Sequence, residues 1–118
     1  MTDTKKSIID KATSHFKTVM SQDLLGPIDV PEWDAQIYYR PSSTMAQETK
    51  VIELTQAGKT TEALILTLIQ RACDENGEAI FHPGDRARLM NAVDPKVILR
   101  VVTTMGEEQG EAEQYLGN

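Results

Sequence analysis

The chain has few of the residues on which disulfide-bonded and metal-binding proteins rely. Its 118 residues include one cysteine, two histidines, one tryptophan, three tyrosines and two phenylalanines. A single cysteine, Cys73, excludes an intrachain disulfide and fits a reducing compartment. We interpret Cys73 as a small buried side chain, and the scarcity of aromatic residues predicts a core that is mostly aliphatic.

Long apolar runs and an excess of positive charge are also missing. No run approaches the roughly 20 residues of a membrane span. The start of the chain leads into an amphipathic segment, without the apolar region of a secretory signal. Twelve basic residues stand against 18 acidic ones, and the formal net charge of -6 opposes binding to a phosphate backbone. We therefore expect a cytosolic protein that binds neither membranes nor nucleic acid.

The length of the chain is that of one domain. We predict a single globular domain over residues 7–105, preceded by a flexible N-terminus at 1–6 and followed by an acidic flexible tail at 106–118. Basic residues cluster near the start, and the tail carries only acidic charges, at Glu107, Glu108, Glu111 and Glu113. Both clusters are typical of solvated chain ends.

Apolar residues recur every three or four positions in several segments, which is the spacing of one helical face. The first segment runs from Ser7 to about Ser21, and Ser7 and Asp10 have the order of a capping pair. Its apolar face consists of Ile8, Ile9, Ala12, Phe16, Val19 and Met20. We predict an amphipathic helix that ends before Gly26-Pro27.

Two more helices are predicted in the middle of the chain. Thr44 and Gln47 can form a capping box for a helix over 44–57, which the following glycine ends. The next helix, over 61–72, is apolar nearly all round and should be the central, most buried element. We therefore expect Leu66→Asp to abolish cooperative folding, because it would place an unpaired charge in the core.

Two shorter patterns complete the helical part. A fourth helix is predicted around residues 87–93. Asp94 is a suitable N-cap and Pro95 a suitable first residue for a fifth helix, which should end at Met105, with a glycine just beyond.

A short β-hairpin is predicted between Ile28 and Pro41, where β-branched and aromatic residues flank a polar break. Pro31 and Pro41 cannot donate to a strand ladder, so they should lie at strand ends or on an edge. Whether residues 78–81 join the hairpin as a third short strand is left open. The predicted fold class is α+β, mainly α, with about five helices.

The tripeptide Gly58-Lys59-Thr60 is similar to the end of a phosphate-binding loop. Such a loop needs another glycine five residues earlier and follows a strand. Here the earlier position is Glu53, inside a predicted helix. We interpret the tripeptide as the end of one helix and the start of the next.

Other patterns that could carry chemistry are incomplete. A calcium loop is suggested by oxygen-bearing side chains at Asp74, Asn76, Glu78 and Asp85. Its glycine stands at the fourth position instead of the sixth, so a polar turn is favoured. His15 and His82 lie in distant segments, and Cys73 follows an apolar helix without an activating neighbour. We predict no cofactor, no metal site and no catalytic residue, and an enzyme activity only if a partner completes the site.

The hairpin is the candidate surface for self-association. Trp33 stands beside its turn, and the strands carry an apolar face formed by Ile28, Val30, Ile37 and Tyr39. A small sheet leaves ladder groups available to a neighbour, and aromatic residues often anchor interfaces. We predict a homo-oligomer assembled through these residues. Two competing accounts bury the hairpin inside its own domain and fold Trp33 back against the first helix.

Three short segments then carry a resemblance to a known family. Val30-Pro31-Glu32-Trp33-Asp34 leads into Ile37-Tyr38-Tyr39-Arg40-Pro41, and a helical segment ends in Cys73-Asp74-Glu75-Asn76-Gly77-Glu78-Ala79-Ile80-Phe81. In this order and separation the segments look like those of the tail assembly chaperones of long-tailed, lambdoid-type bacteriophages. The likeness covers roughly residues 7–105.

The resemblance implies a protein that binds the long, helical tape measure protein and keeps it soluble during tail assembly. It further implies a place in the host cytoplasm, absence from the mature virion, and a contact with the tail tube protein through a frameshifted longer form where one is made. The alternative is a small helical adaptor or regulatory interaction protein of an unrelated pathway, which shares the hairpin motif by chance.

Overall fold

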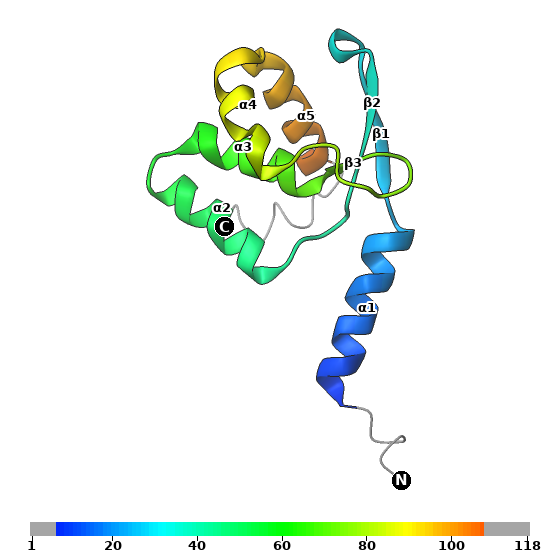
Figure 1. Cartoon of the computed structure of the whole chain (residues 1–118). Coiled ribbons are helices and arrows are strands. Elements are labelled where there is room, and N and C mark those ends of the chain that lie inside the picture. Colours follow the sequence, from blue (N-terminus) through cyan, green and yellow to red (C-terminus); the bar gives the residue numbers. More distant parts are fainter. Residues whose placement is uncertain (1–6, 108–118) are drawn as a thin grey trace.

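The protein is a mainly α-helical α+β fold, as predicted, and the computed structural model describes residues 7–107. The helices are α1 (Ile8–Gln22), α2 (Met45–Gln56), α3 (Thr60–Arg71), α4 (Arg86–Ala92) and α5 (Pro95–Glu107) (Figure 1). The strands are β1 (Leu25–Val30), β2 (Ala35–Tyr39) and β3 (Ala72–Cys73). The flexible N-terminus expected at 1–6 and the tail residues 108–118 lie outside the described residues.

The predicted helix starts are confirmed by their capping hydrogen bonds. The Ser7 hydroxyl accepts from the Asp10 amide at 3.2 Å. Thr44 and Gln47 form a reciprocal capping box, with bonds of 3.1 and 2.9 Å. These contacts satisfy amides that the first turn of a helix leaves without partners.

The fifth helix is longer than predicted. The Asp94 carboxylate accepts from the Lys96 amide at 2.9 Å, as expected of an N-cap. The helix then continues past Met105 through Gly106 to Glu107, so the predicted helix end at Met105 is wrong. A glycine costs a helix only about 1 kcal/mol, and Met105, which is fully buried, anchors the last turn.

The three strands form one antiparallel sheet in the order β1-β2-β3. In the hairpin, Ile28 lies opposite Ile37. The third strand is Ala72–Cys73 and not the segment 78–81, of which only Ala79 forms an isolated bridge, to Cys73. Because α3 ends at Arg71, the chain that leaves this helix runs directly alongside β2.

Helix α3 occupies a central position, since it contacts α2, α4 and α5. It buries Ala63, Ile65, Leu68 and Ile69, and α5 also buries four side chains. Leu66 is only half-buried and Leu68 is fully buried. The expectation that Leu66→Asp places a charge in the core is therefore wrong, because the core position on this helix is Leu68.

The apolar face of the hairpin packs inside its own domain. Ile28, Val30, Ile37 and Tyr39 are at most 7% exposed and belong to the same core cluster as residues of α3 and α5. Their side chains are not available as a surface between copies, which corrects the interface predicted from the sequence. Self-association itself stays a prediction, but it requires another surface.

Trp33 also lies elsewhere than expected. It ends the 3-10 turn Pro31–Trp33 at the tip of the hairpin, whereas α1 joins the other end (Figure 1). Its ring is half-buried and meets Phe81 edge to face, with the centroids 6.1 Å apart. The interpretation that Trp33 folds back against the first helix is therefore wrong.

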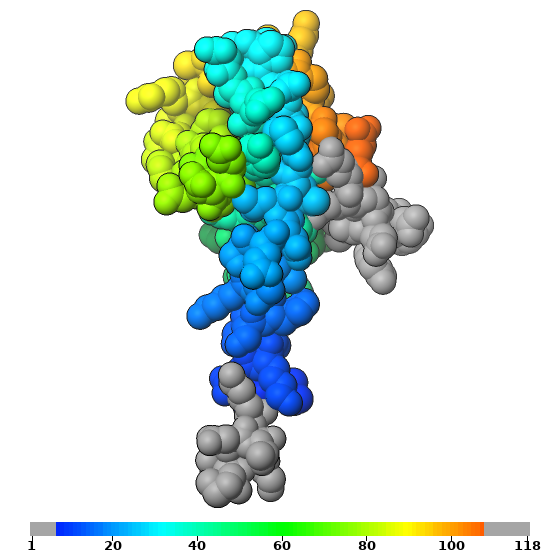
Figure 2. Space-filling view, turned by 90° about the vertical axis from the view of Figure 1, so that its right-hand side faces the viewer, coloured from blue at the N-terminus to red at the C-terminus, as the bar shows by residue number. Residues whose placement is uncertain are grey.

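Helix α1 projects from the rest of the molecule as a stalk (Figures 1 and 2). None of its side chains is buried, and Ile8 and Ile9 are 77% and 67% exposed. Within residues 7–107, no helix is both long and apolar enough to cross a membrane.

Candidate partner-binding surfaces

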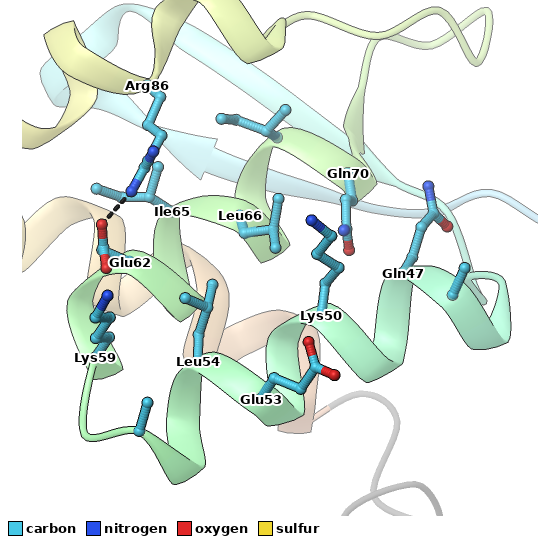
Figure 3. Close-up of a pocket in the computed structure, with 13 residues that line it drawn as sticks. Gln47, Lys50, Glu53, Leu54, Lys59, Glu62, Ile65, Leu66, Gln70 and Arg86 are labelled. Atoms are coloured by element: carbon cyan, nitrogen blue, oxygen red, sulfur yellow. Dashed lines mark hydrogen bonds and ion pairs between the residues drawn. The ribbon is translucent and has the colours of Figure 1, made fainter.

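An apolar hollow lies between α2 and α3, and we call it the α2–α3 groove. It has a volume of about 620 Å³. Leu54 of α2 and Leu66 of α3 point into it (Figure 3). Its other lining residues are Ala46, Gln47, Lys50, Glu53, Ala57, Lys59, Glu62, Ile65, Ile69, Gln70 and Arg86.

The groove follows from the composition of the two helices. They form a tight helical hairpin, in which Gly58 has the positive φ of 80° that lets α2 stop and α3 restart. Since α3 is apolar nearly all round, its contacts with the rest of the core cover only part of its surface. Leu64 and Leu66 remain half-exposed, and Leu66 becomes part of the groove.

The rim of the groove carries charges of both signs. Lys50 and Glu53 stand on the α2 wall. On the α3 side Glu62 forms an ion pair with Arg86, which comes from α4 and closes one end of the groove (Figure 3). An apolar floor between charged walls is suited to an amphipathic helix, whose apolar face can enter while its polar margins meet the rim.

A smaller hollow of about 420 Å³ lies beside Trp33. Trp33, Ile37 and Phe81 line it, together with Leu89 and Val93 of the α4 region. Of the five residues predicted for self-association, Trp33 and Ile37 line this hollow, and Ile37 is 1% exposed. Trp33 keeps an exposed edge that a partner could cover.

The segments that carry the family resemblance meet in space. The Arg40 guanidinium donates to the carbonyls of Gln70 at 2.9 Å and Gly77 at 3.2 Å. The Arg71 guanidinium donates twice to the Arg40 carbonyl, at 3.0 and 2.8 Å, and lies 5.3 Å from the centroid of the Tyr39 ring. Arg40 thus joins the end of the hairpin to the Cys73–Phe81 segment, and these motif residues have a structural role.

The turn after Cys73 is held by its own side chains. The Asp74 carboxylate accepts from the amides of Asn76 and Glu78, at 2.8 and 3.0 Å. Gly77 has a φ of 83°, as the Asn-Gly pair predicts. Burial raises the pKa of the Cys73 thiol, which disfavours the thiolate that nucleophilic chemistry requires.

The other candidate chemical motifs have local structural roles. Gly58-Lys59-Thr60 joins two helices, with no strand before it. Asp85 ends the 3-10 turn Pro83–Asp85 that leads into α4, and its carboxylate accepts from the His82 amide at 3.0 Å. In the part of the chain that the structure describes, no three His, Cys, Asp or Glu side chains are grouped to hold a metal ion.

The groove was not predicted from the sequence, although the apolar composition of α3 indicates it. A helix as apolar as α3 has more apolar surface than one small domain can cover, so part of that surface must face a groove or a partner. No pattern in the sequence indicates that α1 stands free. No family model matches the chain, and no curated protein or solved structure is similar enough to count as a match.

Proposed function

We propose that the protein is a bacteriophage tail assembly chaperone, which binds helical segments of the tape measure protein and keeps them soluble until the tail tube forms. It acts by binding alone, in the cytoplasm of the host cell, and leaves before the virion is complete. The Val30–Asp34, Ile37–Pro41 and Cys73–Phe81 segments support the family, and the α2–α3 groove supports the mode of binding.

The α2–α3 groove carries this proposal. It is an apolar hollow of about 620 Å³ between two helices. An amphipathic helix presents apolar side chains at intervals of three and four residues, and Leu54 and Leu66 offer them a matching apolar floor. A long helical client supplies many such segments, so one chaperone surface can serve the whole client.

The charge of the chain supports a role in solubility. The chain of 118 residues has a formal net charge of -6. A surface with excess charge of one sign keeps a complex from associating further. A client whose apolar stripe is covered by several acidic domains gains both shielding and repulsion between complexes.

Co-expression with the tape measure protein of the same phage tests the proposal. The wild-type chain should raise the soluble fraction of the client and be recovered with it in a pull-down. Leu66→Glu places a charge on the groove floor and should lose both effects. Leu99→Glu is the matched control, because Leu99 is 52% exposed on α5, outside the groove.

Two results would contradict the proposal in different ways. A client that is equally soluble with and without this chain excludes the chaperone function and leaves the adaptor alternative. A client that is bound equally well by the wild type and by Leu66→Glu excludes the groove as its binding surface. Far-UV circular dichroism and thermal melting must show that both variants are folded.

A further inference from the structure

Helix α1 has an apolar stripe that its own domain does not bury. Ile9, Ala12, Phe16 and Val19 recur at intervals of three, four and three residues, the spacing of a helix that packs against other helices. Ile8 and Ile9 are 77% and 67% exposed. An isolated helix of about 15 residues is marginal in water, so a partner that covers this stripe would stabilise α1.

The α2–α3 groove of the same chain is not within reach of this stripe. Only Asp23 and Leu24 separate α1 from β1. The helix points away from the body that carries the groove (Figure 1). Folding α1 back onto α2 and α3 would therefore require Asp23 and Leu24 to reverse the direction of the chain. A second copy has no such restriction.

We propose that α1 of one copy docks in the α2–α3 groove of a second copy, so that the chains assemble head to tail. The apolar stripe of α1 covers Leu54 and Leu66 of its neighbour. This inference rests on the proposed function to the extent that α1 uses the same groove as the client. It adds a second ligand for the groove, which is the chain itself.

Both surfaces carry charged side chains beside their apolar residues. With 100° per residue, Lys11 and Lys17 lie on opposite sides of the apolar stripe, each about 120° from its centre and toward the polar face of the helix. The lysines can reach one carboxylate on each wall, Glu53 of α2 and Glu62 of α3, in competition with Lys50, Lys59 and Arg86 of the groove itself. Long lysine side chains can lie along apolar surface and still reach such partners.

The overall charge of the two parts agrees with this docking. Residues 8–22, which form α1, contain two lysines and one aspartate, whereas residues 24–107 contain twelve acidic and eight basic residues. The helix has one more basic than acidic residue, and the body has four more acidic than basic ones. The two net charges attract each other, and the attraction weakens as salt is added. Because helix and groove are different surfaces, each copy can bind a neighbour on both sides, which yields rings or open chains.

Mixing two complementary variants of the full-length protein tests the proposal. Phe16→Glu damages the stripe and leaves the groove intact, whereas Leu66→Glu damages the groove and leaves α1 intact. In sedimentation across a concentration series, each variant alone should associate about tenfold or more weakly than the wild type, since each places an uncompensated charge in the contact. The equimolar mixture should recover a 1:1 dimer and nothing larger. Leu99→Glu is the control and should associate like the wild type.

Every other outcome overturns the proposal. If Leu66→Glu associates like the wild type, α1 binds something other than the groove, such as a second α1. If Phe16→Glu associates like the wild type, α1 takes no part in self-association. A mixture without the 1:1 dimer, or a wild type that is monomeric throughout the series, excludes docking between copies. The last alternative is a membrane surface. It is supported if the wild type does not self-associate and if the wild type and Leu66→Glu bind equally well to anionic vesicles.

The same variants separate this inference from the proposed function. Phe16→Glu keeps its groove and should still bind the tape measure protein while it fails to self-associate. A wild type that self-associates through the groove but does not bind the client supports the docking and excludes the chaperone function. Since no side chain of α1 is buried, Phe16→Glu should leave the melting of the body unchanged.

Discussion

The ion pair between Glu32 and Arg100 ties the hairpin turn to α5. Arg100 donates two hydrogen bonds of 2.7 Å to the Glu32 carboxylate. These bonds, more than any other cause, lower the pKa of Glu32 from 4.5 to about 2. A carboxyl whose pKa is lower in the folded than in the unfolded chain adds stability above its unfolded pKa and loses it as the pH falls through its folded pKa.

We therefore expect Glu32→Gln to lower the melting temperature modestly at pH 7, because the pair is exposed to solvent. The difference from the wild type should narrow below about pH 4.5 and vanish toward about pH 2, the two pKa values of this carboxyl. Thermal melts of both proteins between pH 7 and about pH 2 measure this difference in melting temperature. Glu75→Gln removes the same charge on an exposed turn and is the control for the loss of charge. A constant difference between Glu32→Gln and the wild type would rule out the pKa shift of Glu32.

Leu66 and Leu68 are two leucines of one helix with different environments. Leu68 is 0% exposed within the core, whereas Leu66 is half-buried in the groove. Leu68→Ala should lower the free energy of unfolding by about 3 kcal/mol, the usual cost of a cavity. Leu66→Ala should cost about 1 kcal/mol, because the groove wall can relax and water already reaches it. Urea unfolding of both variants measures the difference, and equal losses would place Leu66 in the core.

At the scale of elements, the helices could be predicted because their signals are local. Ser7 and Asp10 at α1, and Thr44 and Gln47 at α2, satisfy amides of their own first turn, so their effect depends on nothing elsewhere in the chain. The hairpin was likewise visible in its alternating residues. The predicted boundaries failed at Met105, where tertiary packing of the last turn decides.

The remaining elements depend on contacts between distant parts of the chain. Two residues, Ala72 and Cys73, become a strand only because Arg40 and Arg71 hold the end of α3 beside β2. A period-two pattern shows which face of a hairpin is apolar but not what covers that face. The pattern therefore could not reveal that Tyr39 packs in the core of its own domain. For the same reason the periodicity of α1 predicted a helix but not a helix that stands free.

Hydrogen exchange should show how independent α1 is. At low protein concentration its amides should exchange much faster than those of α3, since no side chain of α1 is buried and four of α3 are. At high concentration docking should slow the exchange of α1. Phe16→Glu should abolish this dependence on concentration. Protection of α1 equal to that of α3 at every concentration would mean that the helix is held within its own chain.

At the scale of the whole molecule, the two proposed ligands of the groove cannot be bound together. The α1 of a neighbouring copy and a client helix both require the floor at Leu54 and Leu66. Each ligand must then weaken the binding of the other by the same factor, because coupling between two equilibria is reciprocal. Self-association would store the chaperone with its apolar surfaces covered, and the client would release it.

We therefore expect a helical fragment of the tape measure protein to dissociate the assemblies of the wild type into 1:1 complexes. The fragment concentration needed for half dissociation should rise with the chaperone concentration, since both compete by mass action. Sedimentation with a labelled fragment measures both species. Leu99→Glu should behave like the wild type, and Phe16→Glu should bind the fragment more tightly, because no α1 competes with it. If the fragment binds to intact assemblies without dissociating them, the client and α1 occupy different surfaces.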